Sequence, residues 1–286
     1  MPGTLYVVAT PIGNLEDITQ HALRVLREAD RIACEDTRQT RRLLDHYGIS
    51  ARPVSYHEHN ERARAEELIS ELEAGRSIAL VCDAGTPLIA DPGYRIVSEA
   101  RARGIAVVPI PGPSAMIAAL SASGLPSDRF CFFGFLPPRT AQRRKALESA
   151  RDLDATLVFY EAPHRILQML EDLDATLGAR RVVIARELTK IHEEFLSGAP
   201  LELRAELASR PAVKGEFTVM VGRAEEGAGG EGADVGGEVE SLMAGGMARM
   251  EAIKTVARRH GLAKREVYRG LMSRADGSSA AKEESE

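Results

Sequence analysis

Cysteine is scarce in this sequence. The 286 residues include three, Cys34, Cys82 and Cys131, which stand far apart and form no paired motif. A disulfide scaffold or a cysteine-based zinc site needs paired cysteines, so this spacing argues against both. Unpaired thiols are typical of a reducing compartment, and we therefore expect a cytoplasmic protein.

Long apolar runs are missing as well. Residues 1–9 carry no basic segment and form too short an apolar run for a signal peptide. The one long uncharged stretch, residues 104–127, contains Pro109, Pro111 and Pro113. These prolines would break the helix of about 20 apolar residues that a membrane span needs. We expect no membrane segment.

An excess of positive charge is also absent. The chain carries 37 Lys plus Arg against 42 Asp plus Glu, and its average net charge of −5 argues against a nucleic-acid partner. The average hides a segregation of charge, however. Residues 241–274 hold eight Lys/Arg and two Glu, whereas residues 222–240 hold one Arg, six acids and seven Gly. A basic module therefore follows an acidic, glycine-rich linker.

The remaining composition is typical of a folded α/β protein. Apolar residues make up 44% and charged residues 28%, which excludes a disordered or collagen-like chain, and the length predicts about two domains. Short Val/Ile/Leu-rich runs alternate with amphipathic stretches, a pattern that indicates parallel or mixed sheets covered by helices. Strands are expected at residues 5–9, 31–34, 53–56, 77–82 and 105–110, and again at 130–135, 155–160, 181–186, 193–196 and 217–221.

A turn-rich segment at residues 124–128 divides this pattern into two parts. Helices are expected at residues 18–28, 39–47, 61–73, 93–103, 114–123, 141–150 and 165–177. We predict an N-terminal α/β domain at 1–123, a C-terminal α/β domain at 124–221, a flexible acidic linker at 222–240, a basic helix-turn-helix-like extension at 241–274 and a disordered tail at 275–286.

Three expected strands of the first part end in loops rich in Pro and Gly, at residues 10–15, 83–87 and 111–115. Glycine at the carboxyl end of a parallel strand lets a ligand approach the main chain. Each loop alone can be an ordinary turn or helix start, but three together favour a binding site. Asp83 caps no obvious helix, which favours a functional role, whereas Asp91, followed by Pro92, is expected to cap the next helix.

Basic residues follow one of these strands. Asp36 precedes Arg38, Arg41 and Arg42. The acid either caps a helix whose arginines form a solvated face, or lies beside a row of arginines that contacts phosphates. A second basic cluster includes Arg143 and Arg144.

Acids and bases also follow strands in the second part, where they could transfer protons or contact phosphates: Glu161, His164, Glu187 and Lys190. His164 by itself is interpreted as a helix-start or packing residue. Residues 57–59 (HEH) lack a third spaced ligand, so we interpret them as a polar loop and expect no metal.

Together these motifs resemble the tetrapyrrole methylase superfamily, and within it the branch that methylates small-subunit ribosomal RNA. The resemblance runs in consistent order from about Thr4 to Val221. It rests on residues 9–19 (ATPIGNLEDIT), 35–38 (EDTR), 83–89 (DAGTPLI), 91–94 (DPGY), 111–115 (PGPSA), 124–130 (GLPSDRF), 159–161 (FYE), 163–165 (PHR), 186–190 (RELTK) and 215–217 (GEF).

The resemblance implies two consecutive α/β domains with S-adenosylmethionine in a cleft between them, and usually a homodimer. It places cofactor contacts at Pro11, Ile12, Gly13, Asp83, Gly85, Thr86, Gly112, Ser114, Ala115, Tyr160, Leu188, Phe217 and Thr218.

The activity implied by the resemblance is methylation of a cytidine 2′-hydroxyl in 16S rRNA of the 30S subunit. That hydroxyl is a poor nucleophile, so a nearby group should accept its proton. Glu35, Asp36, Glu161, His164 and Glu187 are candidates, and our hypothesis is Glu187 paired with Lys190, with Asp36 next. RNA contacts are expected from the arginines named above and from Lys254, Arg258, Arg259 and Arg265 in the basic extension.

Two other functions remain open. A tetrapyrrole-type small-molecule methylase would share the fold and the cofactor, but it would not need the basic extension or the arginine row. A non-catalytic nucleic-acid-binding protein would use the helix-turn-helix-like end, but it would leave the strand-end loops without a purpose. Both fit the sequence less well than an RNA methyltransferase.

Overall fold

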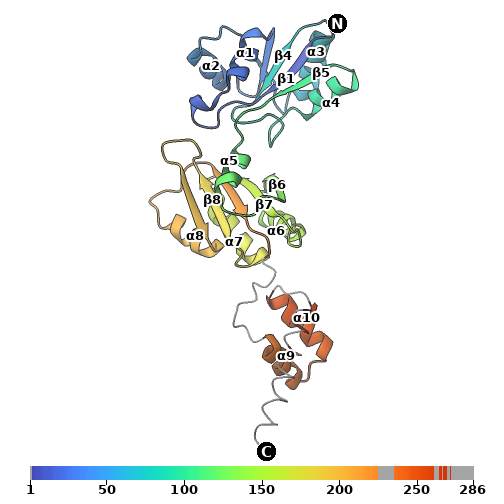
Figure 1. Cartoon of the computed structure of the whole chain (residues 1–286), viewed down its shortest axis with the longest axis vertical. Helices are drawn as coiled ribbons and strands as arrows, with labels where there is room; N and C mark the ends of the chain where they lie inside the picture. The colour runs from blue at the N-terminus through green and yellow to red at the C-terminus, as the bar shows by residue number, and fades with distance from the viewer. Residues whose placement is uncertain (1, 225–234, 261–263, 266, 269–270, 272–286) are drawn as a thin grey trace, which may run out of the picture. The chain divides into compact units, whose positions relative to one another are not determined.

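The computed structural model describes residues 2–224, 235–260, 264–265, 267–268 and 271. The chain divides into two compact units, Met1–Gly222 and Arg223–Glu286. The first unit contains two five-stranded sheets, each covered by helices (Figure 1). The predicted tail at residues 275–286 lies outside the described residues.

The first sheet is entirely parallel, with the order β3-β2-β4-β1-β5. Its strands are β1 (Thr4–Val8), β2 (Arg31–Cys34), β3 (Val54–Ser55), β4 (Ile78–Val81) and β5 (Ala106–Ile110). All four residues of β4 are buried, as expected for an inner strand covered on both faces. The connection after β1 leads to β2, toward one edge of the sheet, and the connection after β4 leads to β5, toward the other edge. In open α/β sheets, ligands bind at the carboxyl ends of two neighbouring strands whose connections diverge in this way.

Helices cover both faces of this sheet. The helices α1 (Gln20–Glu28) and α2 (Thr37–His46) lie on one face, and α3 (Glu61–Glu73) and α4 (Tyr94–Ala102) lie on the other (Figure 1). A short 3-10 helix, η1 (Leu15–Asp17), precedes α1, whose first turn is capped because Thr19 Oγ1 accepts a hydrogen bond from the Ala22 amide at 3.0 Å.

The second sheet is mixed, with the order β6-β7-β10-β8-β9. Its strands are β6 (Phe130–Phe135), β7 (Thr156–Glu161), β8 (Val182–Arg186), β9 (Glu194–Gly198) and β10 (Phe217–Val221). The helices α6 (Thr140–Ser149), α7 (Ile166–Leu177) and α8 (Pro200–Ala208) enclose one core with one face of the sheet. On the other face α5 (Ala115–Ala122) packs through Ala119 and Leu120.

The predicted α/β class with two consecutive α/β parts is confirmed. The ranges of β2, β6, β10 and α3 agree with those expected from the sequence. The helix α8 was not expected, because its sequence shows no clear apolar periodicity. It forms because Leu203 and Leu207 reach the core beneath the sheet.

The second unit contains α9 (Val235–Ala244) and α10 (Arg249–His260), and the described residues 264, 265, 267, 268 and 271 are also helical. The prediction that residues 222–240 are a linker throughout is therefore wrong at its end. Val239 is fully buried against Ile253 and Val256 of α10, so residues 235–240 belong to the helical unit. Apolar contacts override the low helix propensity of Gly236 and Gly237.

Among the described residues, no helix is both long and apolar enough to cross a membrane, and no three His, Cys, Asp or Glu side chains gather as metal ligands. The three cysteines carry free thiols.

Candidate functional site

The three Pro- and Gly-rich loops meet at the carboxyl edge of the first sheet. Thr10 and Gly85 exchange main-chain hydrogen bonds of 2.8 and 3.0 Å, and Thr10 Oγ1 donates to the Cys82 carbonyl at 3.2 Å. Thr86 Oγ1 donates to the Pro113 carbonyl at 3.1 Å. These bonds bring the loops after β1, β4 and β5 together, as their positions at the ends of parallel strands predicted.

At two positions of this edge the structure requires glycine. Gly85 adopts a left-handed φ of +86°, and a Cβ there would lie 3.4 Å from Ile12 Cγ2. A Cβ on Gly112 would lie 2.9 Å from Ala9 Cβ, closer than real Cβ atoms come. At these two positions the loops therefore expose main-chain atoms, which allows a ligand to approach the backbone.

Carboxyl groups from two of the strand ends gather beside these loops. Glu35 follows β2, and Asp83 and Asp91 follow β4. Burial raises the pKa of Glu35 and of Asp83, and it raises the pKa of Asp91 to about 6, with the nearby negative charges of Glu35 and Asp83 adding to it. Glu35 and Asp91 lie within hydrogen-bonding reach of each other.

The expectation that Asp91 caps the following helix is wrong. The residue before α4 is Gly93, at φ +141°, and no side chain caps the helix. The loop instead turns through left-handed backbone at Leu88 and Ala90, with φ of +73° and +68°, and this turn brings the Asp91 carboxyl beside the Cys82 thiol. The sequence did not reveal this position of the Asp91 carboxyl, because an Asp-Pro-Gly segment is equally typical of a residue that caps a helix.

Asp36 does cap its helix. Its Oδ1 accepts a hydrogen bond from the Arg38 amide at 2.8 Å, and its Oδ2 lies 2.9 Å from the Arg38 guanidinium. Both contacts hold the pKa of Asp36 below its usual value. The Asp36 amide donates to Asp83 Oδ1 at 3.0 Å. The lowered pKa makes Asp36 a weaker base than an ordinary aspartate, and its amide joins the end of β2 to Asp83 after β4.

The second sheet contributes Tyr160, Leu188 and Thr218 from a single face. Tyr160 Oη accepts a hydrogen bond from the Met116 amide of α5 at 3.1 Å. Thr218 pairs with Tyr160 across β10 and β7, and Leu188 packs against the buried cluster on this face. The Phe217 side chain lies on the opposite face in the helix-covered core and is 2% exposed. Its predicted cofactor contact is therefore wrong for the side chain, because strand alternation turns it away from Tyr160.

Glu187 and Lys190 form the predicted pair. Lys190 Nζ lies 2.9 Å from Glu187 Oε1 and 2.9 Å from Glu216 Oε2. The hydrogen bond from Lys190 lowers the pKa of Glu187. Burial alone would lower the pKa of Lys190, but its hydrogen bonds to the two glutamates outweigh burial and raise it. Both groups are therefore charged near neutral pH.

The loop that carries this pair rests on the first half of the unit. Glu187 and Thr189 both have left-handed backbone, with φ of +52° and +63°. Thr189 Oγ1 accepts a hydrogen bond from the Asn14 amide at 3.0 Å, and a Cβ on Gly13 would lie 2.5 Å from Lys190 Cγ. We call this region, where residues 10–15, 83–93 and 111–116 meet Tyr160 and residues 187–190, the junction.

The predicted RNA-contacting residues divide into three groups. One group is exposed and consists of Arg38, Arg41 and Arg42 on α2, Lys254 on α10, and Arg265. Arg258 and Arg259 lie on α10, and their side chains are outside the described part of the structure. Arg144 is 46% exposed although its Nε lies 2.6 Å from Asp172.

Arg143 is not available to RNA. Its side chain is 2% exposed, and its Nε donates to Asp172 Oδ2 at 2.6 Å beneath the second sheet. Its Nη1 donates to the Pro138 carbonyl at 3.1 Å. The prediction for Arg143 is wrong because one helical position separates a buried arginine from an exposed one, and charge alone does not reveal which is buried.

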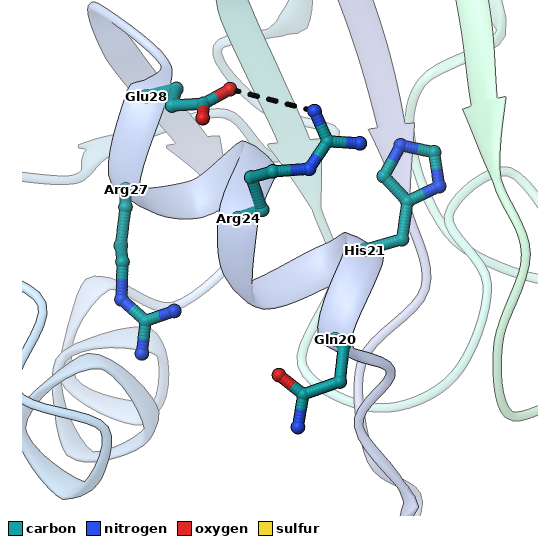
Figure 2. Close-up of a pocket in the computed structure, with 5 residues that line it drawn as sticks. All are labelled: Gln20, His21, Arg24, Arg27 and Glu28. Carbon is teal, nitrogen blue, oxygen red and sulfur yellow. Dashed lines mark ion pairs between the residues drawn. The ribbon is translucent and has the colours of Figure 1, made fainter.

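A shallow depression of about 500 Å³ lies elsewhere, over α1 (Figure 2). Its lining consists of Gln20, His21, Arg24, Arg27 and Glu28. Arg24 and Glu28 are an exposed pair 3.9 Å apart, one turn from each other on the same helix. None of these side chains belongs to the junction, and their pairing is typical of a solvated helix face.

Residues 4–202 match the family of tetrapyrrole (corrin/porphyrin) methylases. The chain is 52% identical over 271 residues to the ribosomal RNA small subunit methyltransferase I of Halalkalibacterium halodurans, with 93% of each chain covered. It is 58% identical over 200 residues to the protein of the same name from Escherichia coli O157:H7, with 70% of each chain covered.

Solved structures share the fold at low identity. A diphthine synthase gives a TM-score of 0.61 at 20% identity, covering 77% of this chain and 90% of the other. A uroporphyrin-III-C-methyltransferase from Thermus thermophilus gives 0.55 at 21% identity, covering 77% and 94%. The fold, the match over residues 4–202 and the close relatives agree, and the chain belongs to the tetrapyrrole methylase family, in its ribosomal RNA small subunit methyltransferase I branch.

Proposed function

We propose that this protein transfers a methyl group from S-adenosylmethionine to the 2′-hydroxyl of a cytidine ribose in 16S rRNA of the small ribosomal subunit. The observation that carries the proposal is the 52% identity, over nearly the whole length of both chains, to an enzyme named for small-subunit ribosomal RNA. A tetrapyrrole substrate is disfavoured because the named close relatives act on RNA and the basic helix α10 has no role on a small molecule.

The junction has the groups that this cofactor would need. S-adenosylmethionine carries a positive sulfonium and an ammonium group, which the acids Glu35, Asp83 and Asp91 would attract. Its carboxylate would be met by amides at the start of α5, after Ser114. Gly85 and Gly112 would let the rest of the molecule lie against main chain. The bound cofactor would supply an activated methyl group.

Methyl transfer forms the bond between the ribose oxygen and the methyl carbon while the bond between carbon and sulfur breaks. The leaving thioether is neutral, and the hydroxyl proton must pass to a protein group or water. We assign Glu187 as the acceptor and Lys190 as the group that orients the oxygen, because the pair extends from a loop at the junction. The lowered pKa of Glu187 keeps its carboxylate deprotonated and ready to accept a proton, but it also makes the carboxylate a weaker base.

The test is methylation of 30S subunits that lack the modification, with labelled S-adenosylmethionine as donor. A 2′-O-methylated nucleotide resists alkaline hydrolysis of the following phosphodiester, so the methyl group can be located by alkaline cleavage and mass spectrometry. Label in a base, or in a tetrapyrrole but not in RNA, would contradict the proposal. Absence of transfer to either substrate, with RNA binding retained, would favour the non-catalytic alternative.

Glu187→Ala tests the assignment of the proton acceptor. We expect kcat to fall about 100-fold or more, as for other general bases, with the affinity for S-adenosylmethionine unchanged. Because Glu187 is already ionised, its titration should not change the wild-type kcat between about pH 6 and 8. An unchanged kcat in the variant would reject Glu187.

The family, for which a homodimer is usual, and the unpaired cysteines also lead us to propose a cytoplasmic homodimer as the working form. Sedimentation equilibrium at several protein concentrations tests the dimer directly, since a monomer at all concentrations would reject it.

A further inference from the structure

The pairing of β6 with β7 shifts by one residue between Phe132 and Phe135. The first three residues of β6 pair in order with Thr156, Leu157 and Val158. Two residues farther along β7, Tyr160 pairs with Phe135, whereas an unbroken register would pair it with Gly134. The extra residue, Gly134, adopts a left-handed φ of +62°. This is a β-bulge, and bulges beside active sites commonly redirect a side chain.

The bulge turns Phe135 to the other face of the sheet. Strict alternation would place Phe135 with Phe133, which stacks on Phe159 in the helix-covered core at 5.2 Å between ring centroids. Phe135 instead makes an edge contact with Tyr160, at 5.8 Å between centroids, and its side chain is 54% exposed. The chain thus removes a phenyl ring from a core position and presents it to solvent.

The exposed ring lies at the junction. Tyr160, which it contacts, accepts the hydrogen bond from the Met116 amide at the start of α5. A Cβ on Gly134 would lie 3.7 Å from Ala90 Cβ, so the bulge rests against the loop that carries Asp91. The negative charge of Asp91 also acts on Tyr160. Phe135 is therefore next to the region to which the cofactor is assigned.

The charges near the Phe135 ring indicate which part of an RNA could bind there. Asp91 and its neighbours, which are assigned to the cationic groups of the cofactor, would repel a phosphate near the ring but not an uncharged base. Single-stranded RNA is read mainly by stacking of splayed-out bases on aromatic rings. We propose that Phe135 is the stacking surface for the base of the nucleotide whose ribose is methylated, an inference that rests on the proposed function.

The test compares Phe135→Ala and Phe135→Trp with the wild type on 30S subunits. Phe130→Ala is the matched control, because Phe130 lies at the other end of β6 and is 41% exposed. We expect Phe135→Ala to lower kcat/KM about 5- to 150-fold, the range found for removal of one stacking partner, and Phe135→Trp to restore most of it. Phe130→Ala should keep the wild-type value, and S-adenosylmethionine affinity by calorimetry should be the same in all four proteins.

Further measurements separate stacking from other roles. A fluorescent cytidine analogue at the target position should be quenched on binding to the wild type and to Phe135→Trp, but not to Phe135→Ala. Unchanged kcat/KM in Phe135→Ala would overturn the inference, as would weaker cofactor binding or dissociation of a dimer in that variant. If the wild type itself methylates no ribosomal RNA, the proposed function fails instead.

Discussion

Adjacent residues with the same charge have different roles in this protein. Arg143 and Arg144 both bind Asp172, which is fully buried, but the first side chain is 2% exposed and the second 46%. The buried arginine neutralises a carboxylate that would otherwise lie uncompensated in the core, while the exposed one keeps most of its contact with solvent. Their substitution should therefore have unequal effects on stability.

We expect Arg143→Ala to lower the free energy of unfolding by about 3–5 kcal/mol, because it leaves the charge of Asp172 without its buried partner. Arg144→Ala is the control and should cost about 1 kcal/mol or less. Urea denaturation at neutral pH measures both. Equal losses would show that the two arginines share the neutralisation of Asp172 evenly.

Asp91 should make stability fall as the pH rises. Its pKa is raised from 3.8 to about 6 in the folded protein, so between about pH 4 and 6 the folded state binds more protons than the unfolded state. The free energy of unfolding consequently falls as the pH passes through this window. Asp91→Asn should stabilise the protein at pH 7, on the order of 1 kcal/mol after allowance for solvent screening, and much less at pH 4.

Thermal unfolding of the wild type and Asp91→Asn at these two pH values measures the difference. The same gain at both would show that Asp91 does not titrate in this window. Glu35→Gln is the companion variant, because Glu35 lies within hydrogen-bonding reach of Asp91 and its pKa is raised in the same direction.

At the scale of elements, the loop after β8 is held by the loop after β1. Residues 187–190 contain two non-glycine residues in left-handed backbone, a conformation that persists only when surrounding contacts impose it. Those contacts include the bond from Asn14 to Thr189 and the close approach of Gly13 to Lys190. Gly13 is therefore a position where side-chain volume would move the proposed catalytic pair.

Gly13→Ala should displace this loop, since the new Cβ would lie 2.5 Å from Lys190 Cγ and 3.0 Å from the Leu188 carbonyl oxygen. We expect kcat to fall about 10-fold or more, because small misplacements of reacting groups are costly, with a loss of about 1–3 kcal/mol in stability. Gly245→Ala is the control, since its Cβ would make ordinary contact at 3.4 Å. Wild-type kcat in Gly13→Ala would show that the loop position is unimportant for the reaction.

At the scale of the whole molecule, charge and fold are divided between units. Residues 1–222 contain both sheets and the junction, and the second unit has its own small core around Val239, Ile253 and Val256. The basic residues 241–274 lie in this second unit, whereas the chain as a whole is acidic. A truncation after residue 222 therefore separates the proposed site of methyl transfer from four of the eight remaining proposed phosphate contacts.

We expect a protein of residues 1–222 to fold and to bind S-adenosylmethionine with wild-type affinity. Its affinity for 30S subunits should be lower, and the slope of log affinity against log salt concentration should be shallower, because fewer counterions are released. Calorimetry and filter binding at several salt concentrations measure these quantities. An unchanged affinity and slope would show that the second unit is not used to hold RNA.

Local sequence patterns were enough to predict the class of fold, the presence of most strands and helices, and the loops of the site. These follow from local periodicity and from Pro and Gly at strand ends, as for the loops at Gly85 and Gly112. The burial of individual charges and the directions of side chains emerged only from the three-dimensional packing. Arg143, the carboxyl of Asp91 and the ring of Phe135 depend on packing between distant segments and on a one-residue bulge, which no local pattern specifies.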